Sequence, residues 1–216
     1  MVNLPQPRPV LWPLRPVESA GVSRSMVGAR KVITIEHAPL AGVTAEMLAW
    51  WYRHVPGTME YAGAMYPRYL VWHPLDHISY DIEDPGDGSR PEIVGAGTKL
   101  HIMEAFGRDP DMLLDIYVTV ERMDERSAVI ARRLIGTSVV QLENEFASAP
   151  SGARYVTRMT LGDDTLPGRV LLNRVARVRA LPPRKLARWI RHHIEEIGNL
   201  ENFLPSLFAQ RADHEP

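Results

Sequence analysis

The chain has 216 residues, of which 45% are hydrophobic and 24% are charged, as is ordinary for a globular protein. A net charge of -1 and a pI near 6.7 give no electrostatic footprint for nucleic acid or for an anionic membrane. The absence of cysteine excludes disulfides, thiolate nucleophiles and cysteine-type zinc sites. We expect a cytoplasmic protein, because no apolar run reaches the roughly 18 residues that span a bilayer and no signal peptide is evident.

The N-terminal part of the chain predicts an irregular arm followed by a strand and a helix. Residues 1–28 are rich in proline, arginine and serine without periodicity. The β-branched stretch 31–37 predicts a strand. Thr44 is placed to cap a helix over 45–54, whose apolar face carries Met47, Leu48 and Trp51.

The middle of the chain predicts strands in succession, separated by turn-forming residues. The absence of alternating helices favours an antiparallel meander over a parallel sheet. The predicted strands cover residues 68–73, 97–107, 113–123, 127–135, 137–146 and 153–162.

A long helix is predicted at the C-terminal end. The segment 169–181 fits a short helix or a strand, and Pro182-Pro183 then open a helix in which proline at the first turn is tolerated. At 100° per residue one apolar stripe contains Leu186, Trp189, Ile190, Ile197, Leu200, Leu204 and Leu207. We expect an α+β fold in which this helix lies on the concave face of a curved sheet, with room for a ligand cavity between them.

The stretch RHHIEEIGNL, residues 191–200, places two histidines and two glutamates on that helix. His192 and His193 are four and three residues before Glu196, and either spacing brings the side chains together. Glu195 points away from the apolar stripe and is expected to face solvent. The stripe favours His193 and the four-residue spacing favours His192, so the residues alone leave the histidine open.

Two further segments carry unusual polar residues. In TKLHIMEAF, alternation places Glu104 on the apolar face with Leu100 and Ile102, where a carboxylate needs a partner such as an arginine or a metal. WHPLDH supplies His73, Asp76 and His77, as candidate ligands or proton carriers or as ordinary hydrogen-bonded loop residues. Together the three segments offer imidazole and carboxylate groups that suit zinc, although iron, manganese or nickel also fit.

YLVWHPLDH, Glu104 within HIMEAFG, and HHIEEIGNLENFLP resemble the diacetylphloroglucinol hydrolase and phloretin hydrolase family. The resemblance covers roughly residues 40–208. It implies a helix-grip fold, similar to Bet v 1 and START domains, in a single catalytic domain over 31–210, with an arm over 1–30 and a tail over 211–216.

The resemblance also implies a zinc-dependent hydrolase that cleaves the carbon–carbon bond between a phenolic ring and an acyl group by a retro-Friedel–Crafts reaction with metal-activated water. The substrate would be an aryl ketone such as an acylphloroglucinol or phloretin, and a homodimer is expected, with neither nucleic acid nor membrane as partner. The family spacing of 31 residues between histidine and glutamate fits His73 better than His77. The implied zinc ligands are His73, Glu104, His192 and Glu196.

The implied catalytic residues are Asp76, His77 and Tyr155, which would move protons or bind the ring hydroxyls. Tyr155 is one of four candidate substrate-binding tyrosines, the others being Tyr61, Tyr66 and Tyr69. The alternatives are a non-catalytic helix-grip carrier of small aromatic ligands and a metal-dependent hydrolase of another 1,3-dicarbonyl-like substrate. A carrier needs no carboxylate on an apolar face, and this separates it from the enzymes.

Overall fold

A curved antiparallel sheet is the largest element of the computed structural model, which describes residues 4–84, 93–134, 136–173 and 181–211. The eight strands follow the order β1-β2-β10-β9-β8-β7-β6-β5, so that all but one of the neighbours are also consecutive along the chain. The strands are β1 (Gly21–Val27), β2 (Arg30–Glu36), β5 (His77–Ile82), β6 (Lys99–Ala105), β7 (Leu113–Met123), β8 (Ser127–Leu134), β9 (Thr137–Ala149) and β10 (Gly152–Leu161).

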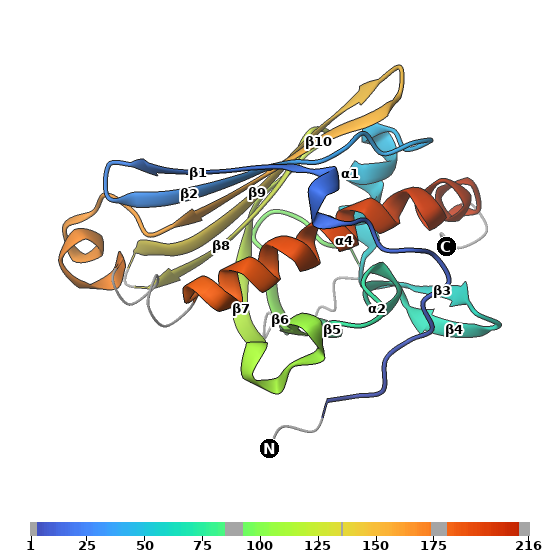
Figure 1. Ribbon diagram of the computed structural model, residues 1–216, viewed down its shortest axis with the longest axis horizontal. Helices are drawn as coiled ribbons and strands as arrows, with labels where there is room; N and C mark the ends of the chain where they lie inside the picture. The colour runs from blue at the N-terminus through green and yellow to red at the C-terminus, as the bar shows by residue number, and fades with distance from the viewer. Residues whose placement is uncertain (1–3, 85–92, 135, 174–180, 212–216) are drawn as a thin grey trace.

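The remaining elements cover the concave side and one end of this sheet. They are the helices α1 (Ala45–His54), α2 (Arg68–Trp72) and α4 (Pro183–Ala209), the hairpin β3 (Thr58–Tyr61) and β4 (Ala64–Pro67), and the short helical turns η1 (Val17–Ser19), η2 (Phe106–Arg108), η3 (Pro110–Met112) and η4 (Gly168–Leu172). Figure 1 shows the sheet curling around α4, with β1 and β2 on one side of the helix and β5 and β6 on the other. The predicted α+β helix-grip architecture is confirmed.

Two helices form as their sequences predict. The hydroxyl of Thr44 accepts a hydrogen bond from the backbone N–H of Met47 and caps α1, whose Leu48 and Trp51 are fully buried. All seven residues of the predicted apolar stripe on α4 are buried. Since each such side chain contributes about 1.5–3 kcal/mol when it leaves water, this stripe fixes which face of α4 meets the sheet.

Residues 68–73 do not form the predicted strand. Arg68–Trp72 fold as the helix α2, and the strand of this region is β5, which begins only at His77. α4 holds α2 in place, because the side chain of Asn199 donates to the carbonyl oxygens of Val71 and Trp72. Tertiary contacts with α4 therefore override the strand propensity of this short apolar segment.

The irregular arm is shorter than predicted, since residues 21–27 form the edge strand β1. Six of its seven residues are exposed, and for this reason the sequence lacks the alternation that marks a half-buried strand. The segment 169–181 begins within a π-helical turn, Gly168–Leu172. Residues 174–180 of the segment lie outside the described residues. Within the described ranges, none of the helices combines the length and apolar character needed to cross a membrane.

The arm runs beside the β3–β4 hairpin and then crosses α4 (Figure 1). Trp12 stacks on Phe203 of α4, and the hydroxyl of Tyr61 donates to the carbonyl of Pro9. Arg15 pairs with Glu201 at 2.5 Å. The arm thus packs along α4 and the hairpin.

Gly198 allows the arm to lie close to α4, because a Cβ atom at this position would lie 2.4 Å from Cδ of Arg15. We expect Gly198→Ala to lower the free energy of unfolding by about 1–3 kcal/mol, the usual cost of overpacking. In an Arg15→Ala background most of the Arg15 side chain that the new Cβ would meet is absent, and alanine favours helix over glycine by about 1 kcal/mol. The cost of Gly198→Ala should therefore fall by at least half in that background. Urea unfolding of the wild type, the two single variants and the double variant measures both effects. Equal costs of Gly198→Ala in the two backgrounds would show that Arg15 does not limit the space at Gly198.

Candidate metal centre

Three elements bring two histidines and two glutamates together in the interior. His77 opens β5 and lies directly opposite Glu104 of β6 in the strand register. His192 and Glu196 lie on successive turns of α4, facing the same strands. All four side chains are buried, so each charge must be met by a neighbouring group.

The two imidazoles of this cluster each present an unpaired nitrogen to the carboxylates. Nδ1 of His77 donates to the carbonyl of Tyr69 at 2.6 Å, and Nδ1 of His192 donates to Asp76 at 3.1 Å. When the rings are neutral, these bonds leave each Nε2 atom as the position that a metal could take. Both Nε2 atoms are buried without a hydrogen bond.

The spacing of the free nitrogens and the carboxylate oxygens fits a divalent ion. Nε2 of His77 lies 3.2 Å from Glu196 and 3.7 Å from Glu104. Nε2 of His192 lies 3.7 Å from Glu104 and 3.8 Å from Glu196. Ligands 2.0–2.2 Å from a tetrahedral ion are about 3.4 Å apart, so His77, Glu104 and His192, whose ligand atoms all lie within 4.8 Å of one another, could hold a metal such as zinc. Glu196 approaches both histidines, and we call the four residues the His77 cluster.

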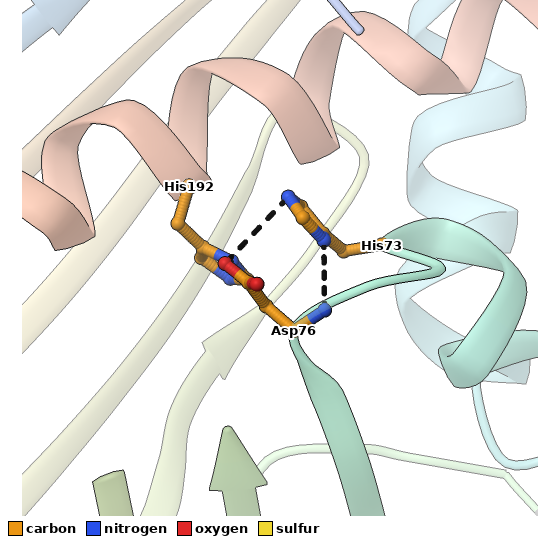
Figure 2. A group of neighbouring side chains, drawn as sticks. All are labelled: His73, Asp76 and His192. Carbon is orange, nitrogen blue, oxygen red and sulfur yellow. Dashed lines mark hydrogen bonds and ion pairs between the residues drawn. The ribbon is translucent and has the colours of Figure 1, made fainter. Parts of the chain in front are cut away.

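His73 lies in a different group, as Figure 2 shows together with Asp76 and His192. Its Nδ1 accepts from the backbone N–H of Asp76, and its Nε2 donates to Glu195 at 3.2 Å. Both ring nitrogens of His73 thus have hydrogen-bond partners, and His73, Asp76 and His192 form a second group whose ligand atoms lie within 4.8 Å of one another. Among the described residues, no contact joins His73 to Glu104 or Glu196, in contrast to the expectation from the 31-residue spacing.

Glu195 is buried, and the expectation that it faces solvent is wrong. The side chain pairs with His73 on one oxygen and with Arg191 at 2.8 Å on the other. Helical periodicity placed Glu195 opposite the apolar stripe, but the α2–β5 connection covers that side of α4. Burial raises the pKa of Glu195, yet His73 and Arg191 outweigh burial and hold the pKa below its usual value.

Asp76 lies behind His192 rather than on the cavity wall. One carboxylate oxygen accepts from the ring of His192, and the other accepts from the backbone N–H groups of Gly107 and Arg108 at 3.0 and 3.3 Å. Burial raises the pKa of Asp76, but His192 and His73 lower it to about 2. Burial likewise lowers the pKa of His192, but Glu104, Asp76 and Glu196 raise it to about 9.

His193 holds the second oxygen of Glu196. Its Nδ1 is paired with Glu196, and its Nε2 meets the hydroxyl of Thr157 at 2.8 Å. Thr157 in turn donates to Asn144 at 3.0 Å and contacts His37 at 3.1 Å. His193 therefore orients Glu196, while His192 presents the free nitrogen.

Tyrosine hydroxyls lie near the cluster, but they are not the ones predicted, except for Tyr69. Tyr69 donates to Glu104 at 2.5 Å. The Tyr155 hydroxyl pairs with that of Tyr52, and Tyr155 is absent from the walls of the cavities around the cluster. Tyr61 binds the N-terminal arm, and Tyr66 lies in the hairpin.

Two small cavities meet at the carboxylates, and six residues line both: Ile102, Glu104, Ile130, Leu142, His193 and Glu196. The first, of about 70 Å³, is called the tyrosine lobe because Tyr52, Tyr69 and Tyr80 line it together with Asn144. The second, of about 110 Å³, is called the aliphatic lobe because valine, leucine, isoleucine and methionine make up most of its wall. Glu104 and Glu196 thus form a polar boundary between two cavities of different character.

Sequence reasoning missed Tyr52, Tyr80 and Asn144, and it placed His77 among the proton carriers. The alternation in HISYDI after Pro74 is a signal that could have revealed β5 and hence the pairing of His77 with Glu104. No local signal marks Tyr52, which lies in a helix predicted by its cap at Thr44 and by its apolar face.

A sheet that grips a C-terminal helix, with a buried histidine–glutamate cluster between two cavities, defines a helix-grip protein with a candidate metal site. Residues 25–209 match the family described as "DAPG hydrolase PhiG domain", and the chain belongs to this family. The expected resemblance to the diacetylphloroglucinol hydrolases is thereby confirmed, and with it membership of a family of metal-dependent hydrolases.

No curated protein matches the chain. Several solved structures are similar in shape. Ara h 8.0201 is 12% identical, with 81% of this chain and 99% of that chain covered and a TM-score of 0.47. The protein Ms6760 from Mycobacterium smegmatis is 12% identical, covering 81% and 93%, with a TM-score of 0.45. The conserved protein EF2215 from Enterococcus faecalis is 8% identical, covering 89% and 91%, with a TM-score of 0.44.

Metal content distinguishes His77 from His73 as the ligand. We expect His77→Ala to abolish stoichiometric zinc binding, because it removes a free imidazole nitrogen that faces both carboxylates. We expect His73→Ala to retain zinc with an affinity lowered about 10–100-fold, the usual effect of losing a group that acts behind the ligands. Elemental analysis after dialysis against dilute zinc measures both, with His101→Ala on the outer face of β6 as the control. Loss of zinc in His73→Ala but not in His77→Ala would reverse the assignment.

The raised pKa of His192 predicts a pH dependence for metal uptake. In the metal-free protein His192 is protonated below about pH 9, and a metal must displace that proton. The apparent affinity for zinc should therefore rise roughly tenfold per pH unit up to about pH 9 and then level off. Competition with a chromophoric chelator between pH 6 and 10 measures this profile. In Asp76→Asn the plateau should begin at a lower pH, and a flat profile from pH 7 to 9 in the wild type would contradict the prediction.

Proposed function

We propose that this protein is a zinc-dependent hydrolase that cleaves the carbon–carbon bond between a phloroglucinol-type ring and a ketone acyl group. The observation that carries the proposal is the His77 cluster, in which two unpaired imidazole nitrogens face two carboxylates at the meeting point of two cavities. Membership of the diacetylphloroglucinol hydrolase family supports the reaction class.

His77, Glu104, His192 and Glu196 would hold the ion, so His77 would replace His73 in the ligand set that the family resemblance implies. A zinc ion bound there would polarise the ketone oxygen and make a water molecule more acidic. Asp76 positions His192 through Nδ1, in keeping with the carboxylate–histidine pairs found at zinc sites, and it does not reach the substrate. His193 positions Glu196 in a similar way, and Tyr69 positions Glu104.

The tyrosine lobe would receive the phenolic ring. Burial, and for Tyr69 also Glu104, raises the pKa values of Tyr52, Tyr69 and Tyr80 above the ordinary value, so their hydroxyls stay protonated near neutral pH. The hydroxyls of Tyr52 and Tyr80 would donate hydrogen bonds to ring oxygens and favour the keto form of an electron-rich ring, whereas Tyr69 donates its proton to Glu104. Tyr155 supports this wall from behind through its contact with Tyr52.

The reaction balances with water alone. The bond between the ring carbon and the acyl carbon breaks, water supplies the oxygen of the carboxylic acid, and a proton is delivered to the ring carbon. Tyr80 would deliver it, because this tyrosine lines the lobe that would receive the ring. The buried walls of the lobes exclude bulk water from the ring during this transfer.

The direct test is release of phloroglucinol from an acylphloroglucinol by zinc-loaded protein, followed by chromatography. We expect turnover in the wild type and a loss of at least about 100-fold in kcat/KM for Glu104→Gln, which keeps the shape but removes the charge. His101→Gln, on the outer face of the same strand, should retain activity because its ring pairs only with Asp115 and Tyr117. A zinc-loaded wild type that cleaves no aryl ketone would favour another 1,3-dicarbonyl-like substrate.

A further inference from the structure

We propose that the aliphatic lobe holds the acyl substituent, and that this substituent is an unsubstituted alkyl group of several carbons rather than acetyl or a hydroxylated arylalkyl group. The proposal rests on the proposed function, and it specifies the substrate of the same site. It is carried by the contrast between the two lobes.

The lobes are placed to receive opposite ends of one molecule. Both include Glu104 and Glu196 in their walls, so the ketone carbon of a ligand held at the His77 cluster lies where the two cavities meet. If the ring occupies the tyrosine lobe, the chain beyond the carbonyl has the aliphatic lobe as its buried space. The carbon–carbon bond to be cleaved would then cross the boundary between the lobes.

The wall of the aliphatic lobe offers almost no hydrogen bonds. Among the described residues of this wall, those not shared with the tyrosine lobe are aliphatic side chains and Trp189, whose indole N–H is the only additional polar side-chain group in that described part. Val139, Met159, Leu161 and Leu181 are among its buried members. A hydroxyl group placed there would lose its hydrogen bonds to water without replacement, which is costly.

The sizes of the lobes point to the same ligand. The aliphatic lobe, at about 110 Å³, is larger than the tyrosine lobe at about 70 Å³. An acetyl group, with one methyl beyond the carbonyl, would leave most of the aliphatic lobe empty and its walls without contacts. Each added methylene transfers more apolar surface out of water, for about 0.8 kcal/mol or roughly a fourfold gain in affinity.

The experiment compares acetyl-, butanoyl- and hexanoylphloroglucinol with phloretin, whose acyl group carries a hydroxyl. Binding to the metal-free protein is followed by the fluorescence of Trp72 and Trp189, which line the two lobes, and cleavage is followed on zinc-loaded protein. We expect both affinity and kcat/KM to rise roughly fourfold per methylene from acetyl to hexanoyl. Phloretin should fall at least tenfold below hexanoylphloroglucinol.

A matched pair of variants locates the effect. Val139→Thr adds a hydroxyl to the aliphatic lobe with little change of shape, and it should reduce the advantage of hexanoyl over phloretin severalfold. Val55→Thr makes the same change in the tyrosine lobe and should leave the ratios among chain lengths as in the wild type. Thermal unfolding of both variants verifies that they are folded.

The outcomes separate the two proposals. If binding strengthens with chain length but no ketone is cleaved, the assignment of the acyl chain to the aliphatic lobe is supported and the proposed function is overturned. If cleavage is independent of chain length, or is as fast with phloretin as with hexanoylphloroglucinol, the assignment of the acyl chain to the aliphatic lobe is overturned. The proposed function is then unaffected. An equal effect of both threonine variants on the chain-length ratios also overturns the assignment.

Discussion

The burial of two carboxylates between β6 and α4 is the constraint on which the rest of the site depends. An unpaired carboxylate in this position would cost several kcal/mol, so Glu104 and Glu196 require neighbours that donate protons or carry positive charge. Tyr69 meets Glu104, His193 meets Glu196, and the rings of His77 and His192 approach both. The Nε2 atoms of His77 and His192 are buried without a hydrogen bond, so the cluster has two nitrogens that a metal ion could use.

The groups behind the cluster explain how the unpaired nitrogens are kept in place. Asp76 and the carbonyl of Tyr69 fix the tautomers of His192 and His77, so that each Nε2 points to the carboxylates. Asp76 is itself held by backbone N–H groups of η2, directly after the strand that carries Glu104. The position of every group in the cluster is therefore tied to the sheet, to the α2–β5 connection or to α4, and rigid elements of this kind suit a catalytic site.

The same boundary organises the cavity. Glu104 and Glu196 divide a tyrosine-rich space from an aliphatic one, and a ligand that spans both must be polar at one end and apolar at the other. An aryl ketone with an alkyl chain has this character. Under the proposed function, the cluster would set the reaction class, and the walls on its two sides would set the choice of substrate.

The sequence by itself determined the strands from β6 to β10, the capped helix α1 and the apolar face of α4, because each depends on local periodicity and capping. It also identified Glu104, His192 and Glu196 as candidates, since a carboxylate on an apolar face is visible in the alternation of a strand or a helix. Only the tertiary structure placed His77 opposite Glu104, because α4 holds residues 68–72 in a helix and β5 starts at His77. It also buried Glu195 and selected Tyr52 over Tyr155 as a cavity wall, since contacts between distant segments leave no periodic trace in the sequence.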